Sequence, residues 1–338
     1  MKRPTILYAG RGLERLLAAR LAARYQLLPF AGGNALSLGA AVLQSGAALV
    51  HLHTSLAALG RPGALAGIAA AKLCGAGVVC EMHGGALPAR PLPAWQRAAA
   101  ALPDALIAPS AAEAEAYREC LPAQLVVHIA PGIECTPYQR YNRAPLSADS
   151  PLRLVYLGRL VREQGLPEAI EALRLVRGRG LAARLVLAGN GPEEPRLRHQ
   201  VAEAGLARDV AFVGEASDGE KARLLSQADV LVLAAYRAGV PRVLLEAMAA
   251  GVVPVASAVG GIPEVVTPNE HGLLIEPRDA CAIAEAMARL AHARILLARM
   301  SAACRRRVAA VFSLERLAAE LSALYFTLTA APRPRAAL

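Results

Sequence analysis

The sequence has few aromatic residues, very few lysines and no long uninterrupted apolar run. Aromatic residues make up 4% of the 338 residues, and Trp95 is the single tryptophan. Nucleic-acid-binding surfaces typically combine clustered basic residues with interleaved aromatics, so this composition argues against a nucleic-acid partner. The most apolar stretch, residues 56–80, is interrupted by Arg61, Lys72 and several glycines, which argues against a membrane-spanning helix.

The cysteines also lack a functional pattern. The six cysteines form no Cys-x-x-Cys pair and have no regular spacing with histidine. Scattered cysteines in a chain of this length are expected to be reduced and mostly buried, which favours the cytoplasm. The apolar residues 6–9, after the basic start of the chain, are too few for the core of a signal peptide.

Positive charge is abundant, and almost all of it is arginine. Lys+Arg 37 against Asp+Glu 27 gives a formal net charge of +10, and the only lysines are Lys2, Lys72 and Lys221. This balance favours anionic partners such as nucleotide phosphates or lipid head groups.

Apolar runs separated by helical segments occur in both halves of the chain. Such runs are typical of parallel strands that are covered on both faces. A polar, proline-containing segment at 136–151 separates the halves and is predicted to be a linker. Two doubly wound α/β domains of this kind would bind a ligand at the carboxyl ends of their strands, in a cleft. The expected strands are 5–8, 48–53, 77–83, 152–157, 183–187, 210–213, 230–233 and 253–256, and the clearest helices are 13–24 and 167–176.

Two features of the second half suggest a site for a phosphorylated ligand. Gly158-Arg159-Leu160 follows a strand, where a glycine lets backbone N–H groups approach an anion and an arginine matches a diphosphate; a glycine after a strand is also common without a ligand. Glu246 is a single carboxylate on an apolar helix. A buried carboxylate is costly unless it is hydrogen-bonded, and a ribose diol would supply two donors; the alternative is a solvated helix position.

Short motifs follow one another over nearly the whole chain. They are Gly12-Leu13-Glu14-Arg15, His83-Gly84-Gly85, Pro131-Gly132-Ile133-Glu134, Gly158-Arg159-Leu160, Ala188-Gly189-Asn190-Gly191-Pro192, Phe212-Val213-Gly214, residues 236–251, Val259-Gly260-Gly261-Ile262-Pro263-Glu264, Asn269-Glu270-His271-Gly272 and Phe312-Ser313-Leu314-Glu315-Arg316. In this order they resemble the motifs of the retaining GT4 glycosyltransferases of the GT-B fold. The resemblance implies two Rossmann-like domains, residues 1–140 for the acceptor and 151–311 for a nucleotide sugar, and a terminal helix at 312–330 that returns to the first domain.

The resemblance also implies roles for individual residues. Arg159 would bind the diphosphate, Glu246 the ribose, and His83 would lie near the transferred sugar. Gly12 would leave room for the phosphates. The remaining residues expected at the donor are Gly158, Gly189, Gly214, Ala238, Gly239, Val240, Pro241 and Gly261.

The implied activity is the transfer, with retention, of a sugar from a UDP- or GDP-sugar to a glycan or lipid-linked acceptor in bacterial surface polysaccharide synthesis. No Asp-x-Asp occurs, which agrees with a reaction that needs neither metal nor other cofactor. His51, His53 and His83 end two strands of the first domain, but no cysteine or carboxylate accompanies them at ligand spacing, so no metal site is expected. The basic residues of the first predicted helix suggest a peripheral contact with anionic lipid at the inner face of the membrane.

Two departures from the family leave an alternative open. The family usually has a glutamate where Ala238 stands and a lysine where Gln164 stands. Losing a charged hydrogen bond costs roughly 1.5–3 kcal/mol, or about one to two decades in rate. Arg162 or Arg237 are candidates for the missing cation. The alternative is a nucleotide-binding or scaffold protein of the same fold with weak or no transfer activity.

Overall fold

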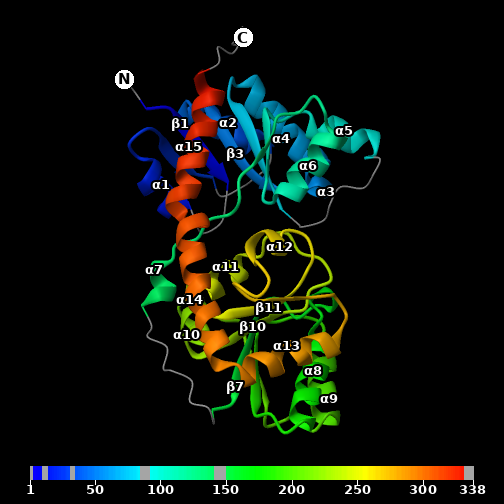
Figure 1. Ribbon diagram of the computed structural model, residues 1–338. Coiled ribbons are helices and arrows are strands. Elements are labelled where there is room, and N and C mark those ends of the chain that lie inside the picture. Colours follow the sequence, from blue (N-terminus) through cyan, green and yellow to red (C-terminus); the bar gives the residue numbers. More distant parts are fainter. Residues whose placement is uncertain (1–2, 10–13, 31–34, 84–91, 141–149, 331–338) are drawn as a thin grey trace. The chain divides into compact units, whose positions relative to one another are not determined.

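The computed structural model describes residues 3–9, 14–30, 35–83, 92–140 and 150–330 (Figure 1). The chain divides into two compact units. Unit 1 comprises residues 1–132 and 314–338, and unit 2 comprises residues 133–313. Each unit is built on a six-stranded sheet in which all described strand pairs are parallel.

The sheet of unit 1 has the strand order β2-β1-β3-β4-β5-β6. Its elements, in chain order, are β1 (Thr5–Ala9), α1 (Glu14–Leu21), β2 (Gln26–Pro29), α2 (Ala35–Ser45), β3 (Leu49–Thr54), α3 (Leu56–Leu59), α4 (Pro62–Leu73), β4 (Gly77–Met82), α5 (Ala94–Ala100), β5 (Ala105–Ala108), α6 (Ala111–Cys120), β6 (Val126–His128) and α15 (Leu314–Ala330).

Both faces of this sheet are buried, and neighbouring residues of one strand belong to different cores. Leu7 of β1 packs in one core with Ile68 of α4, whereas Ile6 packs in the other with Leu17 of α1 and Leu321 of α15. Successive side chains of a strand point to opposite faces, so an all-apolar strand fits a sheet that is covered twice. The C-terminal helix therefore completes the second core of unit 1.

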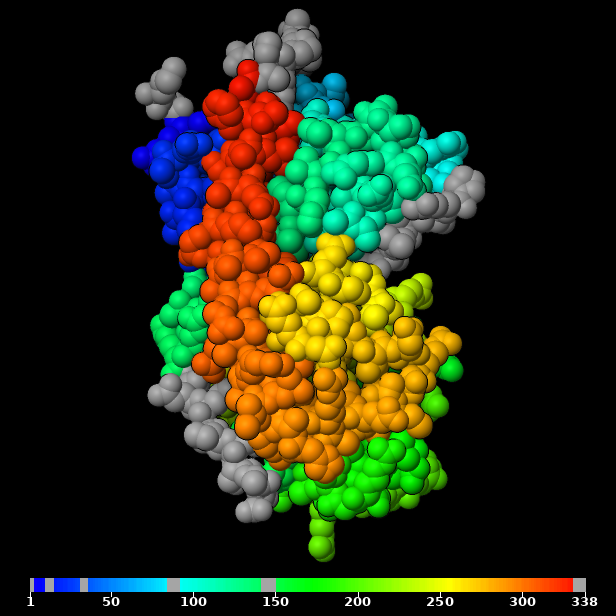
Figure 2. Space-filling view, viewed as in Figure 1, coloured from blue at the N-terminus to red at the C-terminus, as the bar shows by residue number. Residues whose placement is uncertain are grey.

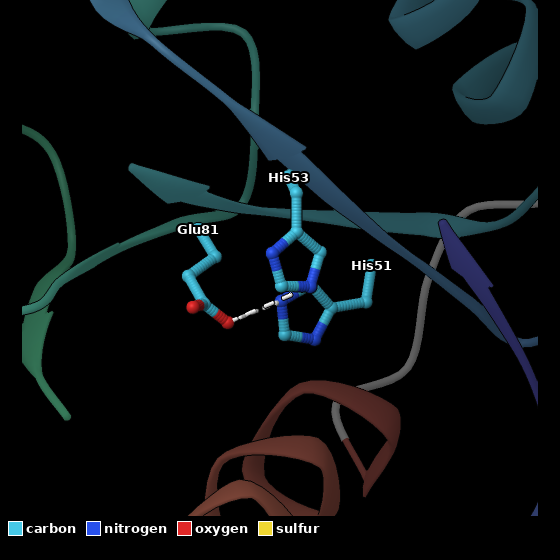
Figure 3. Close-up of side chains that lie close together, drawn as sticks. All are labelled: His51, His53 and Glu81. Carbon is cyan, nitrogen blue, oxygen red and sulfur yellow. Dashed lines mark ion pairs between the residues drawn. The ribbon is translucent and has the colours of Figure 1, made fainter. Parts of the chain in front are cut away.

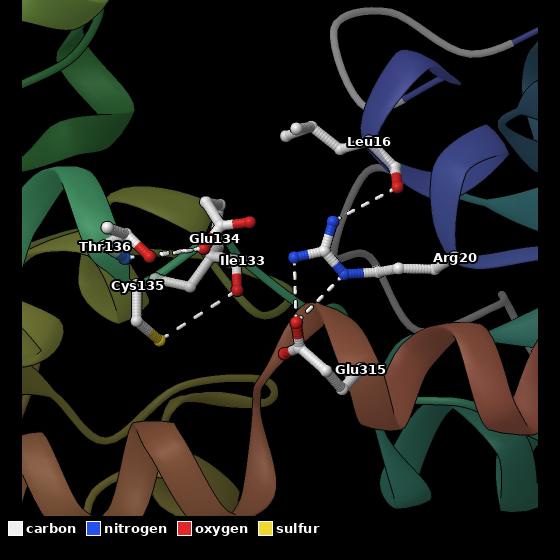
Figure 4. A network of polar contacts seen from close by, with 7 residues as sticks. All are labelled: Leu16, Arg20, Ile133, Glu134, Cys135, Thr136 and Glu315. Atoms are coloured by element: carbon white, nitrogen blue, oxygen red, sulfur yellow. Dashed lines mark hydrogen bonds and ion pairs between the residues drawn. The ribbon is translucent and has the colours of Figure 1, made fainter.

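Polar contacts also hold α15 against α1. Arg20 donates from Nε and Nη2 to Oε1 of Glu315 at 2.9 and 2.7 Å, and from Nη1 to the carbonyl of Leu16 (Figure 4). The Tyr25 hydroxyl donates to the carbonyl of Ser322. Figure 2 shows the side chains of α15, in red, directly beside those of the blue N-terminal segment. The positive charge of Arg20 is therefore paired with a carboxylate of the same unit.

The sheet of unit 2 has the strand order β12-β11-β10-β7-β8-β9. Its elements, in chain order, are α7 (Thr136–Gln139), β7 (Leu152–Leu157), the 3-10 helix η1 (Arg162–Gln164), α8 (Leu166–Gly178), β8 (Ala183–Ala188), α9 (Glu194–Glu203), β9 (Val210–Gly214), α10 (Asp218–Gln227), β10 (Val230–Leu233), α11 (Arg242–Ala249), β11 (Val253–Ser257), α12 (Ile262–Val265), β12 (Leu273–Ile275), α13 (Ala280–His292) and α14 (Arg294–Val311).

The centre of this sheet combines apolar packing with one buried ion pair. Tyr156 of β7 packs in a core with Leu173 of α8 and Met287 of α13. Next to that core, the fully buried Asp229 accepts hydrogen bonds from the backbone N–H, Nε and Nη2 of Arg153. A buried carboxylate needs such partners, and here they also join β7 to the start of β10.

All eight expected strands are present, and none of their ends differs from the expected end by more than one residue. The expected linker is wrong at its start, because residues 136–139 form α7, which packs against α10 and α11. For the same reason the division falls after Gly132 and not after residue 140. Residues 141–149 of the expected linker lie outside the described residues. The short strands β2, β5, β6 and β12 were not expected from the sequence.

None of the helices in the described segments combines the length and the apolar character that crossing a bilayer requires.

Candidate functional site

The loops at the carboxyl ends of β7, β8 and β9 are joined to one another by backbone hydrogen bonds. The N–H of Gly158 donates to the carbonyl of Ala188, and the N–H of Gly189 donates to that of Gly214, at 2.9 and 2.7 Å. The Tyr156 hydroxyl donates to the carbonyl of Arg159 at 2.7 Å. The backbone that carries Arg159 is therefore fixed from two sides.

Gly189 makes the close approach of these loops feasible. Its φ is +144°, and an added Cβ would lie 1.8 Å from the carbonyl oxygen of Gly158. Only glycine fits where two backbones meet at this distance. This glycine keeps the floor of the site free of side-chain atoms.

Above these loops, unit 2 contains a cavity of about 610 Å³. Four of the predicted site residues line it, namely Gly158, Arg159, Gly189 and Glu246. Arg159 is exposed, so its guanidinium is accessible to a ligand. Positive and negative predicted residues therefore line one cavity, at the carboxyl ends of the strands where open α/β sheets bind ligands.

Glu246 lies on the apolar helix α11 and is buried, with 7% of its side chain exposed. Its Oε1 accepts a hydrogen bond from Nε of Arg242, one helical turn earlier, at 3.1 Å. The hydroxyl of Tyr138, on α7, is its second partner; burial first, and then this carboxylate, raise the pKa of Tyr138 above its usual value. The solvated alternative for Glu246 is thus wrong, and two side chains of the chain itself already support the carboxylate.

The loop at 238–241 is placed by contacts with the glycine pair before α12. Gly261 donates from its N–H to the carbonyl of Gly239 at 3.1 Å. Gly260 has φ +55°, and a Cβ there would lie 1.6 Å from the carbonyl oxygen of Ala238. Among the described residues, the cavity lining does not include Gly214, Ala238, Gly239, Val240, Pro241 or Gly261.

His83 belongs to unit 1, where it follows β4. Its N–H donates to the carbonyl of Thr54 at 2.7 Å, and its Nε2 lies 2.6 Å from Nδ1 of His53. About half of the His83 side chain is exposed. Gly12, the other predicted residue of this unit, lies outside the described residues.

Family models match both halves of the chain. The model of glycosyl transferases group 1 matches residues 139–307, which is half of the chain, and the model of glycosyltransferase family 4 matches residues 7–136. The chain belongs to the glycosyl transferases group 1 family.

Curated relatives match part of the chain at about one-third identity. The amylovoran biosynthesis glycosyltransferase AmsK of Erwinia amylovora is 35% identical over 148 residues, 42% of this chain and 36% of the relative. A GDP-mannose-dependent alpha-(1-6)-phosphatidylinositol monomannoside mannosyltransferase of Mycobacterium tuberculosis is 32% identical over 214 residues, 60% of this chain and 56% of the relative. These matches span about half or less of the length of the relatives.

Solved structures match the described fold nearly from end to end. Sucrose-phosphate synthase from Thermosynechococcus elongatus has a TM-score of 0.80 at 22% identity, covering 98% of this chain and 100% of that one. Anabaena Alr3699/HepE, solved in complex with UDP-glucose, has a TM-score of 0.76 at 19% identity, covering 96% and 99%. The two parallel sheets with their helices are thus those of the GT-B fold.

Two basic residues that were not predicted from the sequence to belong to the site line this cavity. Lys221, on α10, lines it and lies 3.0 Å from Oδ1 of Asp218; Arg242 also lines it. The cations proposed from the sequence, Arg162 and Arg237, are not among the lining residues of the described cavity. Lys221 follows no recognised motif, and its one sequence signal is that lysine is rare in this chain.

The role of Gly189 predicts a destabilising substitution. Gly189→Ala should lower the thermal midpoint of unit 2, because the new Cβ would meet the Gly158 carbonyl at 1.8 Å. Gly178→Ala is the matched control, since nothing lies within 4 Å of a Cβ at that position. Both substitutions replace glycine by alanine, so both lower the conformational entropy of the unfolded chain by the same amount. Differential scanning calorimetry of both variants measures the effect; equal midpoints would show that the loops can separate at no cost.

Proposed function

We propose that the chain is a retaining glycosyltransferase that uses a UDP- or GDP-sugar as donor, without a metal ion, and a glycan or lipid-linked sugar of a bacterial surface polysaccharide as acceptor. The observation that carries the proposal is that Arg159 and Glu246 line one cavity of unit 2. The names of two relatives agree with this class: one acts in amylovoran biosynthesis and another depends on GDP-mannose. UDP-glucose is the ligand of the structurally similar Anabaena protein.

The charges of the cavity suit a nucleoside diphosphate. Arg159 would donate to the diphosphate oxygens, and Lys221 would add a second positive charge in place of the lysine that Gln164 replaces. Glu246 would accept from the ribose hydroxyls through an oxygen that Arg242 does not occupy. Because Arg242 and Tyr138 already hold this carboxylate, the ligand would meet an acceptor that needs little reorganisation.

The proposed transfer keeps the sugar configuration by reacting on one face. The bond between the anomeric carbon and the phosphate oxygen breaks, and the acceptor oxygen bonds to that carbon from the same face. The acceptor proton goes to the departing phosphate oxygen, so no separate base is required. Arg159 and Lys221 would stabilise the charge that develops on the diphosphate.

The basic charge of unit 1 supports a second part of the proposal, a peripheral contact with anionic lipid in the cytoplasm. Arg15 and Arg24, in and after α1, are exposed. Arg20 pairs with Glu315 and does not contribute, and Arg11 lies outside the described residues. One of the two acceptor classes proposed above, a lipid-linked sugar, agrees with such a contact.

One alternative rests on a specific observation. Ala238 supplies no carboxylate, and its carbonyl faces Gly260. A protein with this cavity and no acidic group at that loop would bind a nucleotide yet transfer sugar slowly or not at all.

Binding of the nucleotide gives the most direct test. Arg159→Ala and Glu246→Gln should each weaken UDP or GDP binding by about 10–100-fold, because each removes a charge-assisted hydrogen bond of about 1.5–3 kcal/mol. Isothermal titration calorimetry measures this, with thermal midpoints of the free variants as a check of folding. Arg174→Ala, an exposed arginine paired with Glu171 on α8, is the control and should bind as the wild type does. If both site variants retain full affinity, the nucleotide binds elsewhere.

Ala238→Glu distinguishes a weakened transferase from a binding protein. The new carboxylate should raise hydrolysis or transfer of the best-binding nucleotide sugar by about one to two decades, the rate equivalent of one charged hydrogen bond. Arg237→Glu places the same group one residue away, at an exposed position, and should give no such gain. Unchanged turnover in Ala238→Glu would favour the binding protein.

The lipid contact is tested by sedimentation with anionic liposomes. The double change Arg15→Glu and Arg24→Glu should weaken binding by at least about fivefold per residue, since a basic residue near such a surface contributes about 1 kcal/mol. The double change Arg174→Glu and Arg196→Glu alters the net charge equally in unit 2 and is the control. Equal losses in both variants would mean that net charge alone governs sedimentation.

A further inference from the structure

Three side chains of unit 1 converge on one face of its sheet, outside the cavity described above. His51 and His53 are two residues apart on β3, and Glu81 on β4 is paired in register with His53 (Figure 3). Alternation along a strand places both histidines on the same face, and the parallel register brings the carboxylate to them. This is the face that α1 and α15 cover.

The distances from the two histidines to Glu81 are close to the separation of ligands around one ion. Nε2 of His51 and Nε2 of His53 lie 3.3 and 3.7 Å from the same oxygen, Oε2 of Glu81. One ligand atom from each residue lies within 4.8 Å of the others. Tetrahedral zinc with bonds of about 2.0–2.2 Å separates its ligands by about 3.3–3.5 Å. Small side-chain shifts would therefore complete a three-ligand site.

The surroundings of His51 point independently to a ligand. The residue is fully buried, and its Nε2 makes no hydrogen bond of good geometry, although it faces the Glu81 carboxylate. Its other nitrogen, Nδ1, lies 2.6 Å from the hydroxyl of Tyr325 on α15. When Nδ1–H donates to that hydroxyl, the lone pair of Nε2 points at an anion, and a cation between the two relieves the repulsion.

The surroundings provide the outer contacts that metal-binding histidines have in proteins. Tyr325 would orient His51, and His83, whose Nε2 lies 2.6 Å from Nδ1 of His53, would orient His53. The Tyr8 hydroxyl forms a hydrogen bond of 2.8 Å with Nε2 of His53. A bound ion would take the place of this hydroxyl as the partner of Nε2. About a fifth of the His53 side chain is exposed, which leaves a route for an ion to reach the ligands.

We propose that His51, His53 and Glu81 bind one first-row divalent transition ion, such as Zn²⁺, in unit 1. Imidazole favours zinc, iron, nickel and copper, whereas magnesium and calcium prefer sites made of oxygen alone. The ion would join β3 to β4 and, through Tyr325, would tie α15 to the sheet. From the sequence, no metal site was expected at His51 and His53, because no carboxylate lies near them in the chain. Glu81 lies beside them only because β3 pairs with β4.

The test is Zn²⁺ binding to the full chain, untagged and without nucleotide, measured by calorimetry and by metal analysis after gel filtration. The wild type should retain one Zn²⁺ per chain and bind Mg²⁺ far more weakly. Glu81→Gln, which keeps the shape and removes the charge, should lose this equivalent. Tyr325→Phe should weaken binding by about 10–100-fold, as loss of an outer contact does.

His199→Gln is the matched control, because His199 is an exposed histidine 3.6 Å from the carboxylate of Glu203 and should not contribute. Co²⁺ added to the wild type should give visible bands of a nitrogen- and oxygen-ligated ion, a readout that needs no variant. No binding to the wild type with Zn²⁺ in large excess would overturn the proposal. Equal binding by Glu81→Gln and the wild type would also overturn it, since the ion would then lie elsewhere, for example on cysteines.

Discussion

The proposed donor site depends on the buried carboxylate of Glu246 and on the side chains that form hydrogen bonds with it among apolar neighbours. Arg242, four residues earlier on α11, and Tyr138, on α7, both contact it. An unpaired carboxylate at this depth would be strongly destabilising. These partners hold the carboxylate at the wall of a cavity that Arg159 and Lys221 also line. Opposite charges at fixed places around one cavity are what recognition of a ribose and a diphosphate requires.

The two units use the same structural principle at different places. In each, a parallel sheet is buried on both faces, and polar residues collect where strands end or lie beside one another. In unit 2, glycine allows two loops to approach closely enough to form the floor of a cavity. In unit 1, the register between β3 and β4 gathers His51, His53 and Glu81 under α15. Both arrangements depend on strand pairing, which brings together residues that are distant in the sequence.

The site residues that could be predicted are those that neighbouring residues in the sequence identify. Arg159 directly follows a strand, and Glu246 interrupts an apolar helix, so each could be identified from its neighbours in the sequence. Lys221 could not, because it reaches the cavity from α10 through the tertiary fold. Glu81 was missed because the pairing partner of a parallel strand is not encoded nearby. Helix α7 was missed because its proline and polar residues resemble a linker, while the burial of Tyr138 comes from the packing of α7 against α10 and α11.

The proposed binding of a nucleoside diphosphate between Arg159 and Glu246 of unit 2 can be observed in a crystal structure of the chain grown with UDP or GDP. We expect diphosphate oxygens within hydrogen-bond distance of the Arg159 guanidinium and ribose hydroxyls within that distance of the Glu246 carboxylate. A nucleotide bound outside this cavity, with Glu246 contacting only Arg242 and Tyr138, would contradict it.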